Sequence, residues 1–218
     1  MKRRTFALAA AATALPATFL AGLPARAQSG KPYKELTPPV PVDTPPGQIE
    51  VIEFFSYACP FCKQFEPSFE AWIKTVPKNV TLQRVHVGWN MDGLMAAPLQ
   101  RIYYSLQALE QVGALQAKVF NALQTEHKRL DQPNVLFDWV AQQGVDRAKF
   151  EQAYNSFGVA NQIERAARTT DAYRVESTPS LAIAGRFVTD PGLAKGFEPM
   201  LKLTDTLIAQ ARQANKPA

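Results

Sequence analysis

Residues 49–62 read IEVIEFFSYACPFC and place a pair of cysteines directly after an apolar run. The run from Ile49 to Ser56 is rich in branched and aromatic residues, which is typical of a short strand buried on both faces. After the cysteines, apolar residues recur at helical spacing along one face, at Phe65, Phe69, Trp72, Ile73 and Val76. The stretch therefore predicts a buried strand, a Cys-X-X-Cys turn and an amphipathic helix in succession.

A second strand is expected from Asn79 to Trp89. A strand, a helix and a strand in such close succession form a βαβ unit, which favours parallel pairing with a right-handed crossover. We therefore assign residues 49–90 to the first part of an α/β domain. The preceding residues 28–48 hold six prolines and are expected to be an extended arm with at most a short edge strand.

The pattern changes to successive amphipathic helices between Met95 and about Tyr173, and we interpret residues 91–173 as an inserted all-helical subdomain. The helices are expected to break near Gly113, Gln132–Pro133, Gly144 and Gly158. Their bulky apolar residues are expected to form a small helical core, so no cofactor is expected there. These residues are Leu136, Phe137, Trp139, Val140, Phe150, Tyr154 and Phe157.

Residues 174–218 are predicted to complete the α/β domain. Strand-like segments at Leu181–Ala184 and Arg186–Thr189 flank a tight turn near Ala184–Gly185, which indicates a β-hairpin. A final helix is expected from residue 197 to residue 211, with four residues facing inward: Phe197, Leu201, Ile208 and Ala211.

The first 27 residues have the parts of an export signal. Basic residues 2–4 precede an apolar stretch, and Ala-Arg-Ala at residues 25–27 matches a signal-peptidase site, so cleavage is expected after Ala27. A transmembrane anchor is less favoured because Pro16 and Gly22 interrupt the apolar stretch. Both secretory and twin-arginine export stay open, and either route leads out of the cytoplasm.

Outside this segment the chain is nearly neutral. The formal charge of +5 includes four bases and no acid in residues 1–27, so the remainder carries 20 bases and 19 acids. The basic balance of the whole chain is therefore no evidence for nucleic-acid binding.

The segment Cys59-Pro60-Phe61-Cys62 contains the only two cysteines of the sequence. Cys59 is expected at the N-cap of the helix, with Pro60 at the first helical position. Free backbone N–H groups and the helix dipole there favour a thiolate, so a mixed disulfide through Cys59 breaks readily. Cys62, one turn into the helix, is expected to be the less exposed resolving thiol. The oxidised pair is thus predicted to donate its disulfide to other thiols.

The pair has two alternative interpretations. A zinc site needs three or four ligands, and only His86 and His127 remain to join the thiols, so no metal is expected. A purely structural disulfide would close a loop too short to constrain the unfolded chain much. Both histidines are interpreted as surface or packing residues.

The dipeptide Thr178-Pro179 directly precedes the predicted strand at Leu181. Together with the Cys-X-X-Cys turn and the later hairpin and helix, it is a candidate cis-proline loop lying against the cysteine pair. An exposed backbone segment there could bind a substrate peptide by strand addition.

These residues resemble the thioredoxin superfamily and, within it, the DsbA-like thiol:disulfide interchange proteins. The resemblance covers most of residues 33–215 and rests on EFFSYACPFC (53–62), the helix after it, the helical insertion and TPSLAIAGRFV (178–188). It implies an α/β thioredoxin fold with an inserted all-helical subdomain, and a periplasmic enzyme that oxidises the free cysteines of unfolded or folding exported proteins. It also implies reoxidation by a membrane quinone reductase similar to DsbB. A monomer is expected.

The same resemblance assigns roles to single residues. It makes Cys59 the nucleophile, Cys62 the resolving thiol and Pro179 the cis-proline. Glu53 matches a buried acid of the family, which could relay protons to or from Cys62, and Arg84 matches a basic residue near that acid. The alternatives are an exposed acid at a strand end and a solvated strand charge.

The sequence departs from the most familiar family members at two positions beside the cysteines. Phe61 replaces a histidine, so the thiolate lacks a ring N–H and a positive charge, and the oxidising strength stays open. Thr178 replaces a valine, and its hydroxyl could donate to a thiolate. Phe61, Thr178 and Pro179 are expected to contact the substrate. A disulfide isomerase or reductase, or a non-catalytic peptide-binding module, remains as an alternative function.

Overall fold

The computed structural model describes residues 30–88 and 96–214, so the expected signal peptide at residues 1–27 lies outside the described residues. Five strands form one mixed sheet in the order β1-β5-β4-β2-β3. Strand β2 pairs parallel with β3 and antiparallel with β4, which confirms the predicted βαβ unit and the late hairpin. The strands are β1 (Lys34–Glu35), β2 (Ile49–Phe55), β3 (Val80–His86), β4 (Ser180–Ile183) and β5 (Phe187–Thr189).

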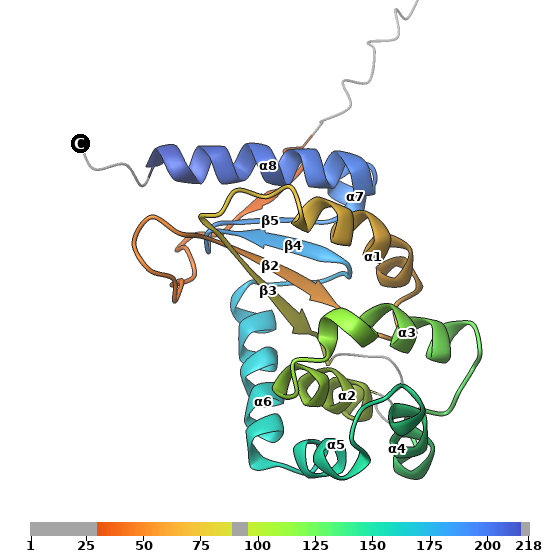
Figure 1. Cartoon of the computed structure of the whole chain (residues 1–218). Helices are drawn as coiled ribbons and strands as arrows, with labels where there is room; N and C mark the ends of the chain where they lie inside the picture. The colour runs from red at the N-terminus through yellow and green to blue at the C-terminus, as the bar shows by residue number, and fades with distance from the viewer. Residues whose placement is uncertain (1–29, 89–95, 215–218) are drawn as a thin grey trace, which may run out of the picture. The chain divides into compact units, whose positions relative to one another are not determined.

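Helices cover both faces of this sheet (Figure 1). On one face lie α1 (Pro60–Ile73), α7 (Pro191–Ala194) and α8 (Phe197–Ala214). The helical insertion between β3 and β4 covers the other face, and its helices are α2 (Ala96–Ala108), α3 (Val112–Gln124), α4 (Pro133–Gln142), α5 (Arg147–Tyr154) and α6 (Phe157–Ala172). The fold is that of thioredoxin with an all-helical insertion, as expected.

Strand β2 lies between two hydrophobic cores because its side chains alternate. Ile49 and Val51 pack with residues of α1 and α8, whereas Ile52 and Phe54 pack with residues of the insertion. Every residue of β2 is buried, as a strand with both faces covered requires. The carboxyl end of β2 is therefore fixed in the sheet, and the cysteine turn begins from this fixed position.

The helices of the insertion break at residues 109–111, 125–132, 143–146 and 155–156, which confirms the breaks expected near Gly113, Gln132–Pro133, Gly144 and Gly158. Two sequence predictions need correction. Helix α1 ends at Ile73, so Val76 lies beyond it. Phe157 is 80% exposed and contributes nothing to the helical core. The reason is that α5 ends at Tyr154 and α6 begins anew at Phe157, where the Ser156 hydroxyl accepts the Val159 N–H; Val159 and not Phe157 is the buried residue of this first turn.

The other predicted core residues of the insertion are buried, which confirms a packed helical core. In α8, Leu201, Ile208 and Ala211 are buried and Phe197 is half-buried against them. The short helix α7 was not predicted; Asp190 caps it by accepting the N–H groups of Gly192 and Leu193. Within the described ranges, no helix combines the length and apolar character needed to cross a membrane.

Candidate active site

The cysteine pair lies where β2 ends and α1 begins. Cys59 has extended backbone geometry (φ −83°, ψ 116°), caps the helix and is followed by Pro60 in the first turn. Its Sγ accepts the backbone N–H of Cys62 at 3.4 Å. Both cysteines are free thiols in this structure. The predicted N-cap arrangement is therefore present, with the sulfur of Cys59 held at the positive end of the helix.

The two sulfurs have opposite acid–base properties. A hydrogen bond from the Cys62 thiol lowers the pKa of Cys59 to about 6, and bonds from the Thr178 hydroxyl and the backbone N–H groups of Cys62 and Phe61 act in the same direction against the cost of burial. Burial and the neighbouring Cys59 raise the pKa of Cys62 far above its usual range. Near neutral pH the pair therefore carries one thiolate, on Cys59, and one thiol, on Cys62.

A second loop closes over the sulfur of Cys59. The Thr178–Pro179 peptide bond is cis, and the Thr178 carbonyl oxygen lies 3.3 Å from Cys59 Sγ. The Ser177 hydroxyl donates to Asp190 at 3.1 Å and thereby ties this loop to the cap of α7. The loop predicted from the sequence thus contacts the cysteine pair, while the Phe61 side chain beside it is 59% exposed and free to meet another molecule.

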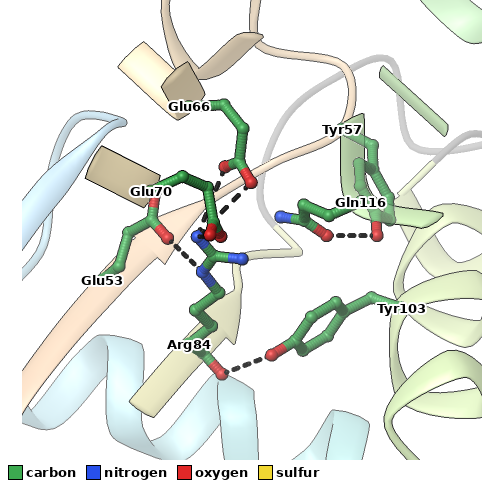
Figure 2. Close-up of polar contacts among 7 residues, drawn as sticks. All are labelled: Glu53, Tyr57, Glu66, Glu70, Arg84, Tyr103 and Gln116. Atoms are coloured by element: carbon green, nitrogen blue, oxygen red, sulfur yellow. Dashed lines mark hydrogen bonds and ion pairs between the residues drawn. The ribbon is translucent and has the colours of Figure 1, made fainter. Parts of the chain in front are cut away.

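Behind the cysteines a buried arginine meets three carboxylates (Figure 2). Glu53 on β2 and Arg84 on β3 are register partners, and Arg84 Nε lies 2.8 Å from Glu53 Oε2. The Arg84 Nη2 atom lies 2.8 Å from Glu70 and 3.4 Å from Glu66, both on α1. Glu53 is 1% exposed. The structure thus brings Glu53 and Arg84 together in the interior, in place of the solvated charges considered as alternatives.

One arginine cannot neutralise the negative charge of three ionised carboxylates. Burial disfavours this excess charge and therefore favours the protonated form of the acids. Burial raises the pKa of Glu53 to about 8 despite the attraction of Arg84. Burial likewise raises the pKa of Glu66 to about 7. The charge of Glu53 is one of the causes that raise the pKa of Cys62, so the acid and the inner sulfur interact electrostatically.

Sequence reasoning missed Glu66. It lies four residues after Cys62, on the face of α1 that also buries Phe65, Phe69 and Trp72. An acid at a core position of an amphipathic helix is the signal that could have revealed it. Together with Glu53 it forms a proton-holding group directly behind the redox pair.

His86 supports the turn before Cys59. Its ring is fully buried; Nε2 accepts the Tyr57 N–H at 3.1 Å and Nδ1 lies 2.9 Å from the Val87 carbonyl oxygen. Since a backbone N–H can only donate, Nε2 is the acceptor, and Nδ1 carries the proton and donates it to Val87. Burial lowers the pKa of His86 to about 3, so the ring stays neutral. This confirms His86 as a packing residue, and His127 lies exposed on the surface.

Comparisons with known proteins agree with this geometry. The family model of the DSBA-like thioredoxin domain matches residues 50–195. The thiol:disulfide interchange protein DsbA of Bordetella parapertussis is 44% identical, over 98% of this chain and 100% of the relative. DsbA of Pseudomonas aeruginosa is 38% identical over 86% of this chain and 87% of the relative. The crystal structure of Pseudomonas aeruginosa DsbA superposes with a TM-score of 0.80, covering 86% of this chain and 95% of that one at 37% identity.

Proposed function

The chain belongs to the DSBA-like thioredoxin domain family, and from this premise we propose that its Cys59–Cys62 pair oxidises cysteines of exported proteins through a mixed disulfide at Cys59. As a member of this family the chain is a protein thiol:disulfide oxidoreductase. The observation that carries the assignment of the nucleophile is the contact of Cys59 Sγ with both the first turn of α1 and the Thr178 carbonyl.

The reaction starts from the oxidised pair. A substrate thiolate attacks Cys59 Sγ, the Cys59–Cys62 bond breaks, and its electron pair passes to Cys62. A second thiolate of the substrate then attacks the substrate sulfur of the mixed disulfide, and Cys59 leaves as a thiolate. The substrate loses two electrons and gains a disulfide, and the enzyme retains both electrons as two reduced sulfurs. Because the pKa of Cys59 is about 6, its thiolate is a good leaving group.

Glu53 serves the first of these two steps. Cys62 becomes a buried thiolate when the disulfide opens, and its high pKa makes that anion unstable. Glu53, with a pKa of about 8, is protonated near neutral pH and can supply the missing proton. Arg84 then holds the resulting carboxylate until it is reprotonated, and the same guanidinium contacts Glu66 and the half-exposed Glu70.

The cis-proline loop supplies the binding surface. The backbone of Thr178 lies beside the reactive sulfur, where an extended substrate segment can add as a strand, and the exposed Phe61 ring offers it an apolar contact. We place the reaction in the periplasm because the expected signal peptide at residues 1–27 leads there and because a disulfide donor needs an oxidising compartment. Reoxidation by a membrane quinone reductase similar to DsbB completes the cycle, and the enzyme works as a monomer.

Trapping the mixed disulfide tests the assignment of the two cysteines. A Cys62→Ser variant, activated as a mixed disulfide with a small thiol, retains the sulfur that bonds to substrate but cannot release it by internal attack. It should accumulate a covalent complex with a reduced test protein, visible by non-reducing electrophoresis. The Cys59→Ser variant should form none. Equal trapping by both variants, or trapping through Cys62 alone, would overturn the proposed roles.

A further inference from the structure

Gln124, the last residue of α3, contacts the backbone of the turn that carries the nucleophile. Its Nε2 atom lies 2.8 Å from the Tyr57 carbonyl oxygen and 3.1 Å from the Cys59 carbonyl oxygen. An amide nitrogen has two N–H bonds, so one side chain can donate to both carbonyls. A residue of the helical insertion thus fixes two peptide groups of the redox turn.

The Cys59 carbonyl oxygen accepts a shorter hydrogen bond from the Gln124 side chain than from the backbone of its own helix. The Lys63 N–H reaches the Cys59 carbonyl at 3.3 Å, a long bond for the first turn of a helix. Next to Gln124, the Thr125 hydroxyl is hydrogen-bonded to the Lys63 ammonium group. Two consecutive residues at the end of α3 therefore hold the first turn of α1 from the insertion side.

The orientation of these carbonyls bears on the charge of the sulfur. A carbonyl oxygen carries partial negative charge, and the Gln124 amide directs the oxygens of Tyr57 and Cys59 toward α3. The Cys59 backbone that these bonds hold also sets where its side chain lies, and Cys59 Sγ accepts the Cys62 N–H at 3.4 Å. If the two carbonyls were released, rotation about the backbone bonds of Cys59 could move its Sγ away from the N–H groups at the start of α1, and the sulfur would lose an aligned donor.

We propose that Gln124 is a positioning residue that keeps the Cys59 thiolate stable, so that the helical insertion tunes the redox chemistry of the thioredoxin part. The proposal rests on the proposed role of Cys59 as the nucleophile. Gln116, on the same helix, differs because it meets the Tyr57 phenol and not the backbone of the turn. Gln124 donates to backbone carbonyls on both sides of Ala58, immediately before α1.

Three variants distinguish the effect of the Gln124 hydrogen bonds on Cys59 from the effect of an added charge and from a general change in the stability of the protein. Gln124→Met has a similar shape but no donor, whereas Gln124→Glu places carboxylate oxygens against the two carbonyls. Asn121→Met is the matched control, because Asn121 is an exposed amide residue on α3 that donates only to Glu126. The readouts are the pH titration of thiolate absorbance, the equilibrium with reduced and oxidised glutathione, and the urea midpoint of unfolding.

We expect Gln124→Met to raise the pKa of Cys59 by about one unit, which is about a tenfold loss of thiolate at pH 5, and to shift the glutathione equilibrium toward the disulfide form by a similar factor. Gln124→Glu should raise the pKa further, and Asn121→Met should leave it unchanged. A purely structural role would lower the urea midpoint without moving the pKa of the folded protein.

The proposal is overturned if Gln124→Met titrates like the wild type, if only Gln124→Glu shifts the pKa, or if Asn121→Met shifts it equally. Should Gln124→Met fail to fold, Gln124→Ala decides by the same titration. Failure of the proposed function is distinguishable, because it would show as an ordinary cysteine pKa in the wild-type protein itself.

Discussion

Replacing Glu53 with glutamine should change how the stability of the protein depends on pH. Glu53 is fully buried and its pKa is raised from 4.5 to about 8, so the folded protein holds a proton there that the unfolded chain has already lost. A group with a raised pKa contributes stability at low pH, and this contribution is lost as the pH rises toward the folded value. Glutamine mimics the protonated acid at every pH and should abolish the loss.

The magnitude follows from the two pKa values. Between 4.5 and 8 the folded state binds about one more proton than the unfolded state, so stability falls by about 1.4 kcal/mol per pH unit. Integrated from pH 5 to pH 8, the Glu53 contribution is on the order of 3.5 kcal/mol. The free energy of unfolding of Glu53→Gln minus that of the wild type should therefore be about 3.5 kcal/mol larger at pH 8 than at pH 5.

Urea unfolding of the reduced protein at pH 5, 6.5 and 8 measures the effect. The difference between variant and wild type cancels the other titrating groups. Glu164→Gln, at an exposed glutamate of α6, is the matched control and should show the same difference at every pH. A Glu53→Gln difference that is constant from pH 5 to pH 8 would refute the view that Glu53 holds a proton in the folded enzyme.

Three further substitutions test neighbouring parts of the site. Phe61→His adds a ring N–H and a partial positive charge beside the sulfur, so it should lower the pKa of Cys59 below about 6; an unchanged thiolate titration would contradict this. Thr178→Val removes a hydroxyl that donates to the Cys59 sulfur, so it should raise the pKa of Cys59; a thiolate titration unchanged from the wild type would contradict this. His86→Phe leaves the Tyr57 N–H without its acceptor and should cost about 1–3 kcal/mol at pH 7.5. Because the pKa of His86 is lowered to about 3, this group should reduce the free energy of unfolding of the wild type by about 2 kcal/mol between pH 7.5 and pH 5. Urea unfolding at the two pH values should show that the variant lacks this decrease.

The parts of the fold that the sequence predicts are those with strong local patterns. The apolar run at residues 49–55 and the helical spacing after the cysteines identified β2 and α1, because both faces of the strand and one face of the helix are buried. The cysteine pair and Thr178–Pro179 were located by motif, and the structure places them in contact.

Tertiary contacts decide the remainder, and they leave little trace in local pattern. Gln124 reaches the redox turn across 65 residues of sequence, and nothing around it distinguishes it from Gln116, the other glutamine of α3. Phe157 looked like a core residue because it continues the helical spacing of Phe150 and Tyr154, but α5 ends at Tyr154 and this spacing does not carry over into α6. Glu66 occupies a core position of α1, but its partner Arg84 belongs to β3, so local pattern does not show that the two residues meet.

The reduction potential of the Cys59–Cys62 pair tests the central claim most directly. Equilibration with glutathione buffers, read by the fluorescence or mobility difference between the two redox forms, gives this value. A stabilised Cys59 thiolate predicts an oxidising pair, with a potential well above about −200 mV and toward the value of about −120 mV known for DsbA. A potential near about −270 mV, as in cytosolic thioredoxin, would contradict the account and indicate a reductase.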